Sequence, residues 1–301
     1  MRITISLPRP GGRPDGTIHD CVELARVIET CGAHSLSVTD HPFPLPPEGA
    51  PGHQAHDPFT LLSFLAAHTS KIRLQISLLV AGYRNPFLAA RMVATLDQVS
   101  QGRAMVTLGA GYQAAEFAAL GVPFEDRGRL LREAPAAMRE AWLGKPVRSR
   151  GLRWTAAGNV MSPACVQRPH PPLWRGGNAP AALVHAATSF DGWAPLEVSD
   201  RFAAAVRTAG LQLHQVPSAI ARLNDLWKAA GRVGTPDVAL VRTRTDWLAD
   251  AGRVRDEIAE LADAGVTWVE LTPAGATIDD QTKSVSATLG TLADAGLLES
   301  L

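Results

Sequence analysis

The chain has 301 residues, 46% of them hydrophobic, and its 29 basic and 29 acidic side chains cancel. This balance gives no net field to attract nucleic acid or a membrane surface, and no apolar run reaches the ~18 residues of a membrane-spanning helix. The three cysteines, Cys21, Cys31 and Cys165, lack metal-ligand spacing and are expected to be reduced thiols of a cytoplasmic protein.

Short apolar runs alternate with segments of helical periodicity along the chain. The expected strands are residues 3–7, 35–39, 72–80, 104–108, 173–175, 191–194, 238–242 and 267–271. Helices are expected between them, including a long tract over 199–230 that is broken near Pro217. Eight strands alternating with helices predict a parallel α/β protein, and eight strands close a (β/α)₈ TIM barrel. An open, doubly wound sheet is the alternative, because periodicity does not reveal closure.

One stretch interrupts this rhythm between the fourth and fifth expected strands. Residues 144–172 are rich in proline and glycine and contain short β-prone pieces such as Leu152 to Thr155. We interpret it as an insertion, a β-hairpin, on one strand-to-helix loop. The prediction is therefore a single barrel domain over residues 1–301, with this insertion.

Two glycine turns directly follow apolar strands and precede expected helices. They are Gly109-Ala110-Gly111 and Gly176-Gly177-Asn178. Such turns let backbone N–H groups approach an anion, and the following helix N-terminus adds a favourable dipole. The pair suggests a phosphate-bearing ligand at one end of the sheet, although simple turn geometry also accounts for glycine at these positions.

Asp40 and His41 follow the second expected strand, where the active sites of barrels lie. Such a pair can bind a heterocycle and transfer a proton near neutral pH; the alternative is a capping Asp and a surface His. Glu116, after the first glycine turn, either faces the pocket or is an exposed acid of a first helical turn. His56 and Asp57 have no third ligand with metal-site spacing, and Asp57 is expected to cap a helix.

Together these pieces resemble the luciferase-like superfamily, in particular its deazaflavin-dependent oxidoreductases. The resemblance rests on the order and spacing of segments over residues 1–195, with a looser match beyond. The matching segments are Ser35 to His41, Asp57-Pro58-Phe59, Tyr83 to Pro86, Leu96 to Arg103, Gly109 to Tyr112, Glu116-Phe117, Leu120-Gly121, Pro171 to Asn178 and Asp191 to Trp193.

The resemblance implies a barrel that holds coenzyme F420 or FMN at the carboxyl ends of its strands. In similar enzymes the residues matching Asp40 and His41 contact the deazaflavin ring, and the His handles a proton or polarises substrate. The positions matching the two glycine turns hold the phosphate and ribityl chain of the cofactor. A cis peptide behind the ring would fall at Ser77–Leu78, which makes both residues candidate cofactor contacts.

Two positions depart from this pattern. Arg175 stands where relatives usually carry an apolar residue, and a cation there can aid phosphate binding. Tyr112 stands where some sugar-phosphate dehydrogenases of the family have Glu. The loop over residues 43–54 has no informative match and is expected to cover the substrate.

The sequence therefore predicts an F420-dependent oxidoreductase that transfers a hydride to or from a small organic substrate. The alternatives are an FMN-dependent monooxygenase, a cofactor-binding protein without catalysis, and a phosphate-binding isomerase or aldolase. The last needs a barrel-facing lysine, which the sequence does not supply at a strand end. We expect a homodimer formed through apolar residues of the second and third helices. These are Leu61, Leu65, Ala66, Ala89, Ala90 and Met92.

Overall fold

The protein is a closed parallel barrel. A computed structural model describes residues 1–7, 17–45, 55–205 and 208–300. Within these residues the barrel strands are, in spatial order, β1 (Arg2–Ser6), β2 (Ser35–Val38), β3 (Arg73–Val80), β4 (Ala104–Gly109), β7 (Leu173–Gly176), β8 (Gly192–Ala194), β10 (Asp237–Arg242) and β11 (Trp268–Leu271). Parallel pairing of β11 with both β10 and β1 closes the ring. The prediction of a (β/α)₈ barrel is confirmed, and the open sheet is excluded.

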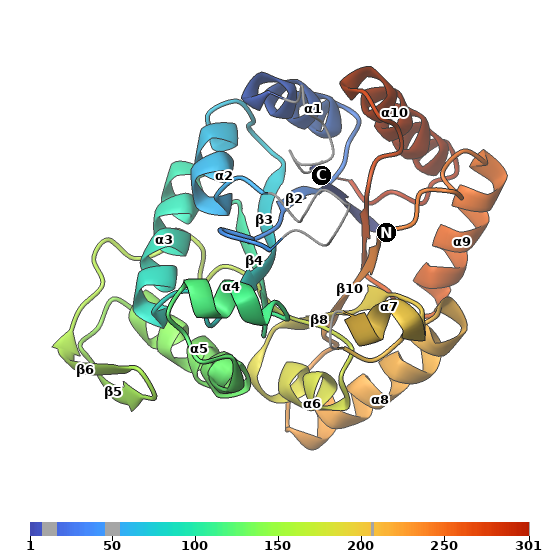
Figure 1. The fold of residues 1–301 in the computed structure, drawn as a ribbon. Coiled ribbons are helices and arrows are strands. Elements are labelled where there is room, and N and C mark those ends of the chain that lie inside the picture. The colour runs from blue at the N-terminus through green and yellow to red at the C-terminus, as the bar shows by residue number, and fades with distance from the viewer. Residues whose placement is uncertain (8–16, 46–54, 206–207, 301) are drawn as a thin grey trace.

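Helices surround the strands as an outer layer (Figure 1). They are α1 (Ile18–Thr30), α2 (Pro58–Ala66), α3 (Pro86–Val99), α4 (Ala114–Ala119), α5 (Arg127–Trp142), α6 (Pro180–Ser189), α7 (Asp200–Ala205), α8 (Val216–Ala229), α9 (Ala251–Asp263) and α10 (Ile278–Asp294). Asp57 caps α2 as predicted, and the side chains of Thr17 and Asn85 likewise accept backbone N–H bonds at the starts of α1 and α3.

The insertion is the expected hairpin, but the expected strand-to-helix loop was wrong: the hairpin lies on the helix-to-strand connection between α5 and β7. Strands β5 (Val147–Gly151) and β6 (Trp154–Asn159) pair antiparallel outside the barrel (Figure 1). The break in the tract over 199–230 was predicted at the wrong place. It falls before the 3₁₀ turn Leu213–Gln215, whereas Pro217 lies in the first turn of α8. A proline is tolerated there, because the first N–H groups of a helix have no partner within the helix.

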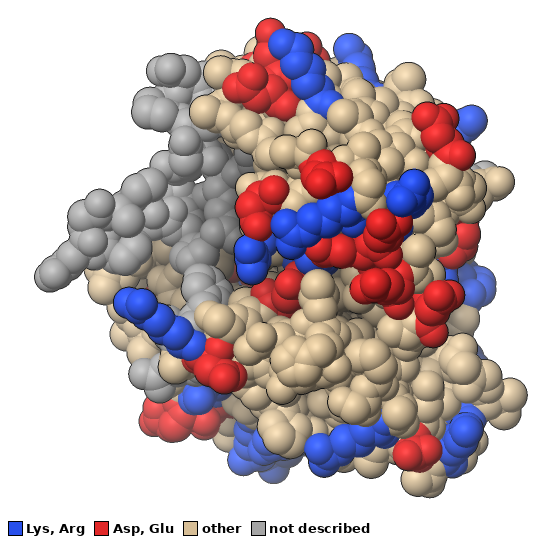
Figure 2. Space-filling view, turned by 90° about the vertical axis from the view of Figure 1, so that its right-hand side faces the viewer, with Lys and Arg blue, Asp and Glu red and all other residues tan. Residues whose placement is uncertain are grey.

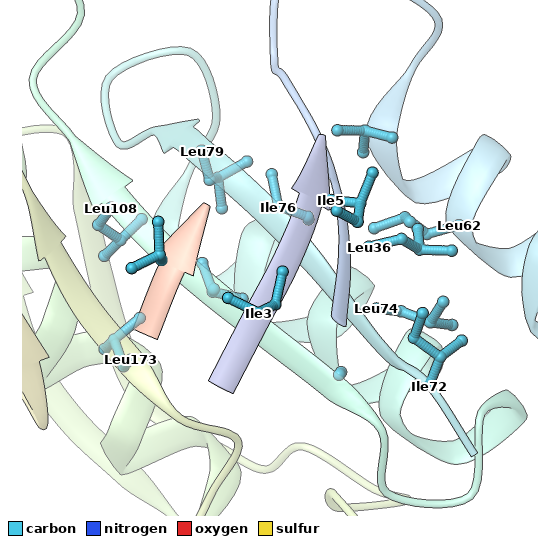
Figure 3. Packing of buried hydrophobic residues seen from close by; sticks show 14 of the residues in the cluster. Ile3, Ile5, Leu36, Leu62, Ile72, Leu74, Ile76, Leu79, Leu108 and Leu173 are labelled. Atoms are coloured by element: carbon cyan, nitrogen blue, oxygen red, sulfur yellow. The ribbon is translucent and has the colours of Figure 1, made fainter. Parts of the chain in front are cut away.

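Two apolar layers hold the barrel together. One layer faces the helices, where side chains such as Ile5, Leu36 and Leu62 pack together (Figure 3). The other lies inside the barrel, because its members come from five strands and still pack in one cluster. They are Met105, Trp174, Ala194, Ala239 and Trp268. Alternate residues of each strand supply the two layers, as the period of a β-strand requires.

The residues proposed to form a dimer face are needed by the monomer itself. Five of the six are buried against the barrel, and Met92 is partly buried against the same core. They therefore leave no surplus apolar face. A homodimer stays a prediction; the large apolar side chains that these two helices expose are Phe64, Leu88 and Val99, at 39%, 54% and 52%.

Opposite charges are interleaved on the outer surface. In Figure 2 Lys and Arg side chains alternate with Asp and Glu over the α9 side of the molecule. Arg253 of α9 exemplifies this, since it pairs with both Asp246 and Glu257. Such mixing agrees with zero net charge and gives this face no single-sign patch. Across the described ranges no helix is long and apolar enough to cross a membrane.

Candidate active site

His41, at the carboxyl end of β2, is held by a buried acid. Its Nδ1 lies 3.0 Å from Oε2 of Glu116 in α4, a side chain with no exposed surface. The same carboxylate accepts the Tyr83 hydroxyl at 2.6 Å and the Phe43 N–H at 2.9 Å. Glu116 is therefore a buried partner of His41 and not an exposed acid. The loops after β2, β3 and β4 meet at its carboxylate.

The charge of this acid fixes the proton on His41. Burial alone would raise the pKa of Glu116, but hydrogen bonds from His41, Tyr83 and the Phe43 N–H outweigh it and hold that pKa below its ordinary value. Burial, with the bond to Glu116, raises the pKa of Tyr83, so the phenol keeps its proton. An ionised carboxylate only accepts hydrogen bonds, so His41 carries a proton on Nδ1. This orients the imidazole and selects its tautomer.

Asp40 is turned away from solvent and toward Arg84. The Arg84 guanidinium donates two hydrogen bonds to its carboxylate, of 2.7 and 2.9 Å, and the Val80 N–H donates a third at 3.1 Å. Burial raises the pKa of Asp40 and the guanidinium opposes this, so we assign an ionised pair. The contact of Asp40 with a cofactor ring stays a prediction. What the geometry shows is that Asp40 ties the end of β3 to the loop after β2.

Leu78 forms an apolar surface over the ends of two neighbouring strands. The Ser77–Leu78 peptide is cis, as the resemblance implied. A Cβ atom on Gly109 would lie 2.4 Å from Leu78 Cδ1, and one on Gly176 would lie 3.0 Å from Leu78 Cδ2. A side chain at Gly109 would therefore displace Leu78, and one at Gly176 would crowd it. The packing of Leu78 therefore accounts for glycine at these two positions without reference to a ligand.

The second glycine turn is tied to the protein through its own N–H groups. Gly177 N–H donates to Ala194 O at 3.0 Å, and Asn178 N–H donates to the Thr208 hydroxyl at 3.0 Å. The side-chain amide of Asn178 also bonds Leu196 at both its carbonyl and its N–H. These two N–H groups are therefore hydrogen-bonded within the protein. A cofactor contact through Gly177 or Asn178 stays a prediction.

In the first glycine turn, two features disfavour any residue other than glycine at Gly111. Its φ is +77°, and a Cβ atom there would lie 2.7 Å from Val80 Cγ1. The helix that follows, α4, has six residues, so its dipole is small. Contacts of Ala110 and Gly111 with a cofactor stay predictions.

An acid inside the barrel was missed at the level of the sequence. Glu270 of β11 is buried and accepts hydrogen bonds of 2.7 Å from the hydroxyls of both Ser37 and Ser77. It connects β2, β3 and β11 beneath the cis peptide. The signal was present, because a carboxylate in the middle of an apolar strand requires polar partners inside the fold.

The expected substrate loop is described only in part. Phe43 and Leu45 are 71% and 66% exposed beside the site, whereas residues 46–54 lie outside the described residues. Among the residues that are described, no group of three or more His, Cys, Asp or Glu side chains is arranged to hold a metal ion. The Asp57 carboxylate caps α2, as expected.

Comparison with known proteins agrees with this architecture. A family model described as luciferase-like monooxygenase matches residues 1–243. An uncharacterised protein of Mycobacterium tuberculosis is 31% identical over 216 residues, which cover 71% of this chain and 68% of that protein.

Two relatives with shorter matches use different cofactors. F420-dependent glucose-6-phosphate dehydrogenase 1 of Rhodococcus jostii is 34% identical over 146 residues, 46% of this chain and 42% of the enzyme. FMNH₂-dependent dimethylsulfone monooxygenase of Pseudomonas putida is 32% identical over 130 residues, 42% of this chain and 36% of the enzyme. The cofactor class of the relatives is thus a flavin or a deazaflavin.

Solved structures share the fold at low identity. The monooxygenase RslO1 of Streptomyces bottropensis superposes with a TM-score of 0.82 at 20% identity, covering 98% of this chain and 99% of that one. An F420-dependent secondary alcohol dehydrogenase gives 0.76 at 17% identity, covering 97% and 98%. At such identities the likeness concerns the fold alone.

Proposed function

This chain belongs to the luciferase-like monooxygenase family, and from that premise we propose that it is an F420-dependent oxidoreductase. The observation that carries the proposal is the imidazole of His41, oriented by the ionised, fully buried Glu116 at the carboxyl ends of the strands. Chemistry in a barrel of this kind takes place at these ends. A histidine with a fixed tautomer is suited to proton transfer near neutral pH.

The residues at this end fit a planar cofactor that carries a phosphate. Leu78 offers a partly exposed apolar side chain over Gly109 and Gly176, against which a ring can pack. Arg175 supplies a cation at the end of β7. We propose Leu78, Ser77 and both glycine turns as the cofactor contacts.

When bound, a deazaflavin exchanges a hydride with an organic substrate. His41 then exchanges the accompanying proton through Nε2, while Glu116 holds Nδ1 and stabilises the imidazolium. Asp40 acts as a positioning residue, because its ion pair with Arg84 fixes the backbone beside His41. The small organic substrate lies next to His41.

The second candidate is an FMN-dependent monooxygenase, which the match to the Pseudomonas putida enzyme favours. Binding of F420 and FMN, measured side by side by fluorescence, separates the two. We expect F420 to bind at least about tenfold more tightly than FMN. Micromolar binding of FMN without measurable binding of F420 would reverse the order of the two candidates.

His41→Ala tests whether the protein is an enzyme or only binds cofactor. A panel of small alcohols, aldehydes and ketones is screened for reduction or reoxidation of F420. The variant is expected to bind F420 normally and to lose ~10²-fold or more in turnover. Turnover equal to that of the parent would show that His41 is structural.

A further inference from the structure

Arg175 is a largely buried cation that has no carboxylate partner among the described residues. It lies near the carboxyl end of β7, and its Nε is buried and makes no hydrogen bond. Burial lowers the pKa of its guanidinium to about 10. Over the ranges that the structure describes, Arg175 forms neither an ion pair nor a hydrogen bond.

Two other buried arginines of this protein are paired with carboxylates. Arg84 donates to both oxygens of Asp40, and Arg242 lies between Glu197 and Glu257, 2.7 Å from the latter. A buried charge is costly unless it is paired and hydrogen-bonded. Arg175 is thus an exception that the stability of the fold does not explain, which indicates that its partner is a ligand.

The charged neighbourhood of Arg175 is basic. A Cβ atom on Gly177 would lie 3.7 Å from Arg175 Nη1, so the guanidinium lies beside the second glycine turn. Arg175 and Arg132, from β7 and α5, both lower the pKa of His185 in α6, after the larger effect of burial. Both guanidinium groups therefore lie near His185 in the middle of α6, and an anion beside Arg175 would offset its positive charge.

We propose that Arg175 is the side-chain anchor of the cofactor phosphate, a contact that rests on the proposed function. The N–H groups of Gly177 and Asn178 are already used within the protein, so a side-chain donor takes their place. A guanidinium can bind two oxygens of a phosphate ester at once. The ligand class is a phosphate monoester or diester, as carried by FMN or F420.

The experiment compares each cofactor with its phosphate-free chromophore. Dissociation constants are measured by fluorescence for FMN against riboflavin and for F420 against its dephosphorylated deazaflavin riboside. The proteins are the parent, Arg175→Leu and Arg175→Lys, with Arg150→Leu on the hairpin as the matched loss of one exposed charge. Thermal unfolding without ligand is recorded for all four.

The parent is expected to prefer the phosphate-bearing form by about tenfold or more, and Arg175→Leu to lose that preference. Arg175→Lys should keep part of this preference, because lysine keeps the positive charge but lacks the planar guanidinium that binds two oxygens at once. Arg150→Leu keeps all of it. The Tm of Arg175→Leu without ligand is expected to equal or exceed that of the parent, because an unpaired buried charge has been removed.

Two results would overturn the assignment. A phosphate preference that is unchanged in Arg175→Leu would place the phosphate elsewhere, even though the proposed function stands. A Tm several degrees lower in ligand-free Arg175→Leu would make Arg175 a structural residue. If the parent binds none of the chromophores, the proposed function fails, and the phosphate anchor fails with it.

Discussion

Glu116 Oε2 lies 3.0 Å from His41 Nδ1, although 75 residues separate the two in the chain. Both side chains are largely shielded, with 0% of Glu116 and 12% of His41 exposed. The pair joins the loop after β2 to the helix after β4. Glu116, whose location the sequence left open, thus determines the orientation and tautomer of the candidate catalytic histidine.

Glu116→Gln tests this relationship without changing the shape of the side chain. The neutral amide no longer requires a proton on Nδ1, so the ¹⁵N spectrum of His41 is expected to change from one tautomer to a mixture. Turnover is expected to fall ~10- to 100-fold while the cofactor still binds. Glu125→Gln is the control, because Glu125 is an exposed acid of the same region. An unchanged His41 spectrum would show that the carboxylate does not select the tautomer.

Asp40→Asn is expected to destabilise the fold, because it leaves the Arg84 guanidinium without its bidentate partner. Breaking one side of a buried pair costs about 3–5 kcal/mol in the free energy of unfolding, measured by urea denaturation. Arg84→Met in the same chain should recover part of this loss, since no buried charge is then left unpaired; the Asp57 carboxylate, which also pairs with Arg84, is exposed. If the losses in the free energy of unfolding were additive in the double variant, Asp40 and Arg84 would not form a direct pair. A contact of Asp40 with the cofactor would then be the better account of its position.

Gly177→Asp is expected to weaken binding of the phosphate-bearing cofactor. The new carboxylate starts from a Cβ 3.7 Å from Arg175 Nη1, where it repels phosphate and competes for the guanidinium. Gly177→Asn is the matched control, because it brings the same strain at φ +103° without the charge. The Asp variant should bind cofactor ~10-fold or more weakly than the Asn variant. Equal affinities would show that backbone strain alone matters there.

His185 is expected to make stability depend on pH. Burial, with Arg175 and Arg132, lowers the pKa of His185 to about 4 in the folded protein, below the ordinary value of 6.5. Between pH 6.5 and 4 the unfolded chain therefore binds the proton first, and stability falls as the pH falls through this window. Above pH 6.5 His185 is neutral in both the folded and the unfolded chain, so it causes no loss of stability there.

The measurement compares urea unfolding at pH 7 and pH 4.5 for the parent and His185→Leu. Replacing His185 should reduce the loss of stability over this interval by about 1–2 kcal/mol. His19→Leu, at an exposed histidine of α1, is the control and should follow the parent. The same loss in all three proteins would assign the pH dependence to other groups.

Much of the scaffold follows from local patterns in the sequence. Alternating apolar residues located β3, and the capping residues Thr17 and Asp57 located the starts of α1 and α2. Pro217 was misinterpreted because proline marks the first turn of a helix as readily as its interruption. The apolar residues of α2 could not be divided between core and partner from the sequence, since periodicity gives a face but not what covers it.

By itself the sequence determined the order of strands and helices, the inserted hairpin and the glycine turns, because these depend on neighbours a few residues apart. Only the tertiary structure decided that Glu116 holds His41, that Glu270 joins Ser37 to Ser77, and that Arg175 has no acidic partner in the part of the chain that is described. Closure of the barrel brings together the ends of strands that are distant in the chain. The ionisation and orientation of their side chains depend on burial and distance, which no local pattern encodes.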